Sequence, residues 1–193
     1  MALPPTPSQT IGPFFHFALL GEDRSELVAQ DHPSAIRIEG TLYDGAGEVV
    51  PDAMLEIWQA DADGRYVPPG GDGEGLVPKA GFSGFGRCGT NAEGRYEFLT
   101  IKPGPVPGPD DGQGPLQAPH IWMSVFARGL LKRAVTRVYF PDEEKANAAD
   151  PIFASIEDPD LRSTLVARPA DEGGVLRFDI HLQGVRQTAF FDV

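Results

Sequence analysis

Cysteine is nearly absent from this sequence, which holds a single one, Cys88, in 193 residues. One cysteine excludes a disulfide within the chain and argues against a metal site built from several thiolates. Long apolar runs are lacking as well, since no stretch reaches the roughly 18 residues that a membrane-spanning helix needs. The first ten residues have neither the basic nor the apolar segment of a secretory signal. We therefore expect a soluble protein of the cytoplasm.

Positive charge is also scarce: 16 Lys and Arg stand against 28 Asp and Glu, which gives a formal net charge of −12. Nucleic acids are bound through basic surfaces, so a nucleic-acid partner is not expected. No P-loop, dinucleotide-binding glycine pattern or Ser-His-Asp order appears. The glycine-rich segment 81–86 (GFSGFG) lacks the strand-to-helix context of a phosphate-binding loop.

Glycine and proline are abundant, with 23 and 19 residues. Together they make up about 22% of the chain against about 12% in average proteins, which excludes a helical bundle. Between 36 and 42, apolar and polar residues alternate, as in a half-buried strand. Similar segments predict strands over 54–60, 95–101, 120–127, 134–140 and within 175–193. Short helices are predicted over 22–31 and 158–167, and long loops over 67–86 and 102–115. The prediction is an all-β fold, a two-sheet β-sandwich with one or two short helices.

The N-terminal segment differs from the rest. Residues 3–13 (LPPTPSQTIGP) contain four prolines and a glycine, which neither a helix nor a central strand tolerates. Phe14, Phe15 and Phe17 follow directly. We expect residues 1–20 to form an arm that docks on the chain's own body or on a partner, and residues 21–193 to form one domain.

Few side chains in the sequence suggest chemistry. The four histidines are not spaced as zinc ligands; they are His16, His32, His120 and His181. The strand pattern makes His181 a solvated residue. His120 opens an apolar strand directly after a loop, and Tyr66 follows a turn; each fits a packing role or a site.

A basic stretch within 127–138 contains no acidic residue. It either receives an anion or forms a solvated hairpin tip, and its members are Arg128, Lys132, Arg133 and Arg137.

Taken together, several segments resemble the intradiol ring-cleaving dioxygenases over nearly the whole chain. They are 6–15 (TPSQTIGPFF), 55–66 (LEIWQADADGRY), 84–106, 118–143, 177–184 (RFDIHLQG) and 187–193 (QTAFFDV). The resemblance implies a β-sandwich enzyme that opens catechol rings with O2. Catalytic subunits of that family hold a non-haem ferric ion through two tyrosines and two histidines, since phenolate oxygens suit a hard trivalent cation.

The resemblance places four positions of this chain at the family's iron ligands. Tyr66 matches the first tyrosine, in a GRY motif, and His120 matches the first histidine of a His-x-His pair. Val106 stands at the second tyrosine, after KPGP, and Trp122 stands at the second histidine. Valine and indole offer no lone pair to a metal. We therefore predict that this chain binds no metal and that Tyr66 and His120 remain as packing and hydrogen-bonding residues.

Within the family, the chain is similar to alpha-type subunits, which lack iron and pair with a homologous, iron-bearing beta subunit in larger hetero-oligomers. This implies Fe(III) in the partner, protocatechuate and O2 as substrates, and no catalytic residue in this chain alone. The arm positions that would wall the substrate pocket are Thr10, Gly12, Pro13 and Phe14. Arg128, in a FARG motif, is expected to bind the substrate carboxylate.

Two alternatives remain at this stage. One is a self-sufficient intradiol dioxygenase with unusual ligands. The other is a non-enzymatic β-sandwich binding module.

Overall fold

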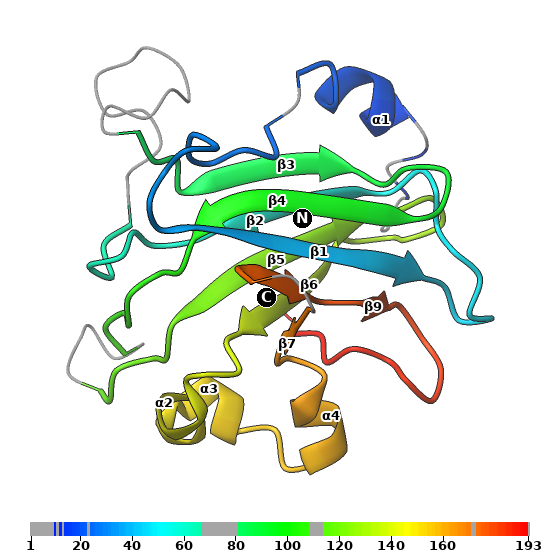
Figure 1. Ribbon diagram of the computed structural model, residues 1–193. Helices are drawn as coiled ribbons and strands as arrows, with labels where there is room; N and C mark the ends of the chain where they lie inside the picture. The colour runs from blue at the N-terminus through cyan, green and yellow to red at the C-terminus, as the bar shows by residue number, and fades with distance from the viewer. Residues whose placement is uncertain are drawn as a thin grey trace, which may run out of the picture.

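Two stacked β-sheets form the body of the protein (Figure 1). The computed structural model describes residues 10, 12, 14–22, 24–66, 81–108, 114–170 and 173–192. One sheet has four antiparallel strands, in the order β3 (Phe85–Gly89), β2 (Met54–Trp58), β5 (His120–Phe126) and β6 (Ala134–Tyr139). The other has five, β4 (Arg95–Ile101), β1 (Ala35–Tyr43), β8 (Val175–Arg177) and β7 (Arg168–Pro169), with β9 (Ile180–His181) paired to β1. The predicted two-sheet β-sandwich is confirmed.

The hydrophobic core lies between the sheets, because alternate residues of each strand point inward. Leu42 of β1 is fully buried, and so are Ile121 and Met123 of β5 on the opposing sheet. Burying an apolar side chain of this size stabilises the fold by roughly 1.5–3 kcal/mol. Trp58 and Trp122 occupy alternate positions and lie on the outer face of the four-stranded sheet, where they are only partly buried. That outer face carries the candidate site.

Four short helices flank the sandwich in the described part of the chain: α1 (Phe14–Leu19), α2 (Glu144–Ala149), α3 (Pro151–Ala154) and α4 (Pro159–Ser163). Asp150 and Asp158 cap α3 and α4 by accepting hydrogen bonds from backbone N–H groups of the first turn. A proline follows each cap, where no N–H is needed. The α4 helix confirms the helix predicted within 158–167, whereas α2 and α3 are too short to show a helical period. None of the described helices has the length and apolar character needed to cross a membrane.

The helix predicted over 22–31 is wrong. Residues 24–28 form isolated β-bridges instead, including one between Arg24 and Arg87 of β3. The Leu27 amide donates a 2.8 Å hydrogen bond to the Leu99 carbonyl of β4. This segment therefore joins the edge strands of the two sheets and buries Leu27, which is 1% exposed. The unpaired backbone groups of two sheet edges outweigh a weak local helix preference.

Two further predicted boundaries need correction. The loop predicted over 67–86 ends before Phe85, where β3 begins; residues 67–80 lie outside the described part. The C-terminal strand divides into β8 and β9, because the Phe178 carbonyl accepts a hydrogen bond from the Tyr96 hydroxyl instead of continuing a ladder. Residues 187–192 contribute one isolated bridge, between Val135 and Phe191.

Candidate functional site

The turn that carries Tyr66 is fixed against the segment that carries Val106. Gly64 has a φ of +76°, and a Cβ on it would lie 2.0 Å from the Pro105 carbonyl oxygen. Only glycine fits a left-handed position in such close contact with backbone. Positions 66 and 106 are thereby held together beyond the end of β2.

Strand β5 presents His120 and Trp122 on the outer face of the sheet, two residues apart. Across the sheet, Trp122 pairs with Trp58 of β2 and Arg137 of β6. The rings of His120 and Trp122 meet edge-on at 6.1 Å between centroids. The Tyr66 ring stacks on Trp58 at 6.1 Å, with 5° between the ring planes. We call the four ligand-matching positions at this end of the sheet the vestigial centre: Tyr66, Val106, His120 and Trp122.

Arg137 is the group that sequence reasoning misplaced. The sequence grouped it with a basic stretch that either receives an anion or forms a solvated hairpin tip, yet the structure leaves Arg137 only 4% exposed, while Lys132 and Arg133 are exposed. Its guanidinium carbon lies 4.0 Å from the centroid of the Trp122 ring, a cation–π contact. The available signal was the period of two along β6, which puts Arg137 on the same face as Tyr139.

A chain of hydrogen bonds, which we call the relay, links Arg137 through Tyr139 to Asp150, the residue between helices α2 and α3. Arg137 Nη1 donates to the Tyr139 hydroxyl at 3.1 Å, and this hydroxyl donates to Asp150 Oδ1 at 3.3 Å. Asp150 is fully buried, and its other oxygen accepts from the Ala118 amide at 2.8 Å. Because residue 118 leads directly into β5, the relay also fixes the start of the strand that carries His120.

His120 is a neutral imidazole with one nitrogen unpaired. Its Nδ1 lies 2.7 Å from the Ala118 carbonyl oxygen, an acceptor, so Nδ1 carries the proton and donates. Nε2 is buried and finds no hydrogen-bond partner among the described residues. Burial, and secondly the charge of Arg137, lower the pKa of His120 from 6.5 to about 4. The nitrogen that could bind a metal is therefore unprotonated but enclosed.

The phenol of Tyr66 is also held in its neutral form. Burial raises the pKa of Tyr66 above its ordinary value, and the opposing effects of the Arg137 charge and the Trp122 indole are smaller. Burial likewise raises the pKa of Tyr139. Neither phenol is thus prepared to act as a phenolate.

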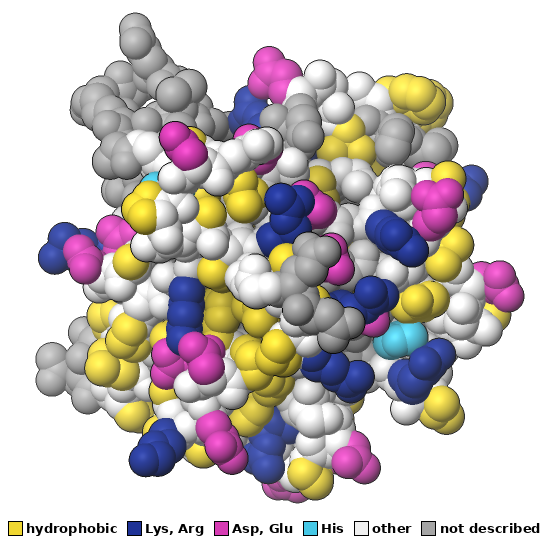
Figure 2. Space-filling model, in the orientation of Figure 1, with side chains coloured by type: hydrophobic (Ala, Val, Ile, Leu, Met, Phe, Trp, Pro, Cys, Tyr) yellow, Lys and Arg dark blue, Asp and Glu magenta, His cyan; other side chains and the backbone are white. Residues whose placement is uncertain are grey.

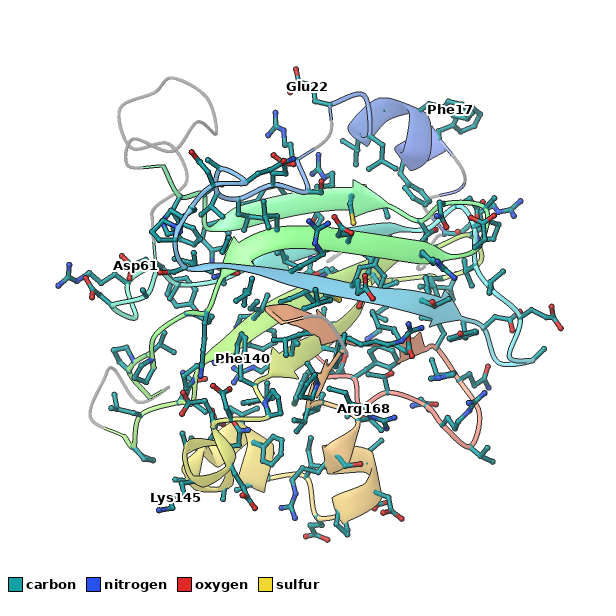
Figure 3. The ribbon with its side chains drawn as sticks, in the orientation of Figure 1. Phe17, Glu22, Asp61, Phe140, Lys145 and Arg168 are labelled. Atoms are coloured by element: carbon teal, nitrogen blue, oxygen red, sulfur yellow. The ribbon has the colours of Figure 1, made fainter. Side chains whose placement is uncertain are left out.

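The α1 helix, which begins with the predicted pocket-wall residue Phe14, lies at the opposite end of the four-stranded sheet (Figure 1). The Leu19 carbonyl, at the end of α1, accepts from Arg87 Nη1 of β3 at 3.4 Å. Phe14 and Phe17 of α1 are 76% and 80% exposed. Figure 2 shows apolar side chains exposed over α1, and Figure 3 places Phe17 at one end of the molecule and Asp61, near the Tyr66 turn, at the other. Phe14 and Phe17 are therefore not part of the vestigial centre.

The structure also describes three of the remaining predicted arm and pocket residues, Thr10, Gly12 and Arg128. Gly12 has a φ of +67°, and its amide donates to Thr10 Oγ1 at 3.3 Å; Pro13 lies outside the described residues. Arg128 follows β5 at the strand end opposite His120, roughly 25 Å away for eight extended residues. Its guanidinium is exposed and forms an ion pair with Asp52. The structure thus groups Arg128 with the α1 end of the sheet.

Comparison with known proteins decides the family. A protein-family profile described as Dioxygenase matches residues 12–184. The chain belongs to the intradiol ring-cleavage dioxygenase family. It is 41% identical over 203 residues to the protocatechuate 3,4-dioxygenase alpha chain of Burkholderia cepacia, covering 97% of each chain. It is also 41% identical to the alpha chain of Pseudomonas putida, covering 98% of this chain and 97% of that one.

Solved structures of intradiol dioxygenases share the fold. The dioxygenase domain of a carbohydrate-binding fusion from Streptomyces sp. SirexAA-E matches with a TM-score of 0.55 and 26% identity, over 94% of this chain and 100% of that one. Hydroxyquinol 1,2-dioxygenase from Pseudomonas putida DLL-E4 matches with a TM-score of 0.57 and 21% identity, over 91% and 65%.

Iron of the intradiol dioxygenase type does not fit the vestigial centre. Tyr66 and His120 supply one phenol and one imidazole, while Val106 and Trp122 supply no donor. In the described part of the chain, no group of three or more His, Cys, Asp or Glu side chains could hold a metal ion. A ferric ion needs more donors and anionic oxygens. The guanidinium of Arg137 adds positive charge to the same centre.

Proposed function

We propose that this chain is the alpha, non-iron subunit of a protocatechuate 3,4-dioxygenase. The assembled enzyme would break the ring bond between the two hydroxyl-bearing carbons of protocatechuate. Both atoms of O2 would end in the two new carboxyl groups of 3-carboxy-cis,cis-muconate. The ferric ion that this ring opening requires is assigned to a homologous beta subunit.

The observation that carries the proposal is the vestigial centre itself. Family membership supplies the reaction class, and the loss of donors at Val106 and Trp122 removes that reaction from this chain alone. The 41% identity to two alpha chains, over 97% of the length of each, agrees with such a role. A second chain type of Burkholderia cepacia, the beta chain of the same enzyme, is 39% identical over 155 residues, which supports a homologous partner.

In this proposal the α1 end of the chain does the functional work. The arm, residues 1–20, would reach from the body, residues 21–193, to the partner's active site. Thr10, Gly12, Pro13 and Phe14 would wall the pocket, with glycine permitting close approach of backbone and the phenylalanine ring excluding water. Arg128 would bind the carboxylate of the aromatic acid through a charge-assisted hydrogen bond.

Co-expression with a beta subunit tests the proposal. We expect this chain alone to hold no stoichiometric iron and to consume no O2 with protocatechuate. Together with its beta partner it should form a complex with one iron per pair, visible tyrosinate-to-iron absorption and protocatechuate-dependent O2 uptake. Iron and turnover in the isolated chain would support a self-sufficient enzyme instead. A beta subunit that neither binds this chain nor gains activity from it would favour the binding-module alternative.

A matched pair of arm variants refines this test. Phe14→Ala should reduce turnover of the assembled enzyme, because the exposed ring would lie in the pocket wall. Leu131→Ala removes a similarly exposed apolar side chain (61%) from the β5–β6 hairpin and should leave turnover unchanged. Equal effects of the two variants would remove Phe14 from the proposed wall.

A further inference from the structure

Arg137 is a buried cation, and in the part of the chain that the structure describes its direct contacts include no carboxylate. Arginine is rarely buried to this extent unless it is paired. Among the described residues, its guanidinium contacts the Trp122 ring at 4.0 Å, the Phe191 ring at 5.9 Å and the Tyr139 hydroxyl at 3.1 Å, while its Nε has no hydrogen-bond partner. Because burying a guanidinium without a direct carboxylate is costly, we expect its positive charge to stabilise another group.

That group is Asp150, which follows Tyr139 in the relay. Asp150 is fully buried, and its carboxylate caps α3, accepts from the Ala118 amide and accepts from the Tyr139 hydroxyl. An isolated buried carboxylate is costly in a low dielectric, so a nearby positive charge adds to the stabilisation that these hydrogen bonds give. Arg137 supplies that charge through Tyr139.

The same guanidinium lies directly over a lost ligand position. Trp122, which stands where the family has a ligating histidine, stacks beneath it, and its positive charge also acts on Tyr66 and His120. Every residue of the vestigial centre that keeps a potential donor therefore experiences a fixed positive charge. A trivalent cation placed there would be repelled by it.

We propose that Arg137 takes the electrostatic place of the metal in this chain and excludes a ferric ion from the vestigial centre. The centre has then lost two ligands and also holds a cation of its own, which is linked to Asp150 through the Tyr139 hydroxyl. The inference rests on the proposed function insofar as it takes this chain to be a metal-free subunit. Its test measures iron in this chain and is independent of dioxygenase activity.

The experiment restores the missing donors with and without the guanidinium. The full chain carrying Val106→Tyr and Trp122→His is compared with the same double variant plus Arg137→Gln or Arg137→Met. A further variant adds Arg137→Lys to the double variant and so keeps the positive charge. The matched control adds Arg133→Gln to the double variant, which removes an exposed arginine of the same hairpin. Each folded variant, checked by near-ultraviolet circular dichroism, is loaded with iron in air, desalted over a chelator and assayed for iron and visible tyrosinate absorption.

Neutralising Arg137 should raise retained iron roughly fivefold or more over the double variant, with a new visible band, since the repulsion is removed. The double variant, its Arg137→Lys version and the Arg133→Gln control should all stay near background. The proposal is overturned if the double variant already binds stoichiometric iron. It is equally overturned if a folded neutral variant retains no more iron than the double variant.

A second measurement covers the case in which the neutral triple variants do not fold. Single variants of the native chain are melted in iron-free buffer. Arg137→Met should lower the melting temperature by about 5 °C or more, and Arg137→Lys by less, because the lysine keeps a positive charge near Asp150. An unchanged melting temperature for Arg137→Met would overturn the proposed role.

Discussion

The two ends of the four-stranded sheet differ in how far their aromatic side chains are exposed. At the end that holds the vestigial centre, which we call the closed end, His120 and Val106 are buried and the half-exposed Tyr66 ring stacks on Trp58. At the other end, which carries α1 and Arg128 and which we call the open end, Phe14 and Phe17 of α1 are largely exposed, whereas Phe15 of the same helix is buried.

The difference shows how a subunit can lack the metal ligands of its family and still contribute to the assembled enzyme. The closed end is stabilised by aromatic contacts and a buried relay, and such contacts serve the fold. The open end carries the exposed rings of Phe14 and Phe17 and the exposed guanidinium of Arg128, and exposed groups of this kind agree with the partner surface proposed above. Mutations at the closed end should therefore change stability, and mutations at the open end should change the activity of the assembly.

The largest effect is expected for Asp150→Ala at the closed end. It removes the cap of α3, the acceptor of the Ala118 amide and the counter-charge of Arg137, so the free energy of unfolding should fall by about 3–5 kcal/mol. Denaturant unfolding of the full chain measures this. Asp158→Ala is the control, because Asp158 caps α4 at an exposed site and should cost about 1 kcal/mol. Equal losses would show that the relay adds nothing beyond capping.

A pair of glycine substitutions tests how tightly the Tyr66 turn is held. Gly64→Ala should cost about 2–4 kcal/mol, since it adds a clash with the Pro105 carbonyl to the strain of a left-handed φ. Gly47→Ala shares the positive φ, +84°, but its Cβ would meet no atom within 4 Å, so about 1 kcal/mol is expected. Unfolding curves of the two variants compare them directly. Similar losses would mean that the turn is not docked as described.

The pH dependence of stability should also report the closed end. The pKa of His120 is about 4 in the folded chain and near 6.5 when unfolded, so the unfolded state binds the extra proton between these values. Stability should therefore fall as the pH drops, by about 2 kcal/mol between pH 8 and pH 5. His120→Gln removes this contribution and should flatten the profile in denaturant titrations. Identical slopes for both proteins would contradict the buried, neutral imidazole.

Much of this architecture was predictable from the sequence because it depends on local periods. The alternation along β5 and β6 predicts the hairpin, and the residue types at 66, 106, 120 and 122 predict the loss of metal donors. The bridges at 24–28 were not predictable, because they depend on which two sheet edges happen to be adjacent. The burial of Arg137 was not predictable for a similar reason, because it depends on Phe191 and Asp150, which are remote in sequence.

The smallest free-energy change is expected at the open end, where it acts on substrate binding. Arg128→Ala in the assembled enzyme should raise the KM for protocatechuate roughly tenfold by removing a charge-assisted hydrogen bond to the carboxylate. Its stability should change by less than about 1 kcal/mol, since the ion pair with Asp52 is partly exposed.

Lys132→Ala is the matched control for Arg128→Ala, because Lys132 is an exposed, ion-paired cation of the same hairpin, 2.7 Å from Asp192. Its KM should match that of the unmodified enzyme. A raised KM for both variants would mean that the overall positive charge of the hairpin, and not a contact of Arg128, attracts the substrate. An unchanged KM for Arg128→Ala would mean that only the partner binds the carboxylate. Only a rise confined to Arg128 shows that the open end of this chain contacts the substrate.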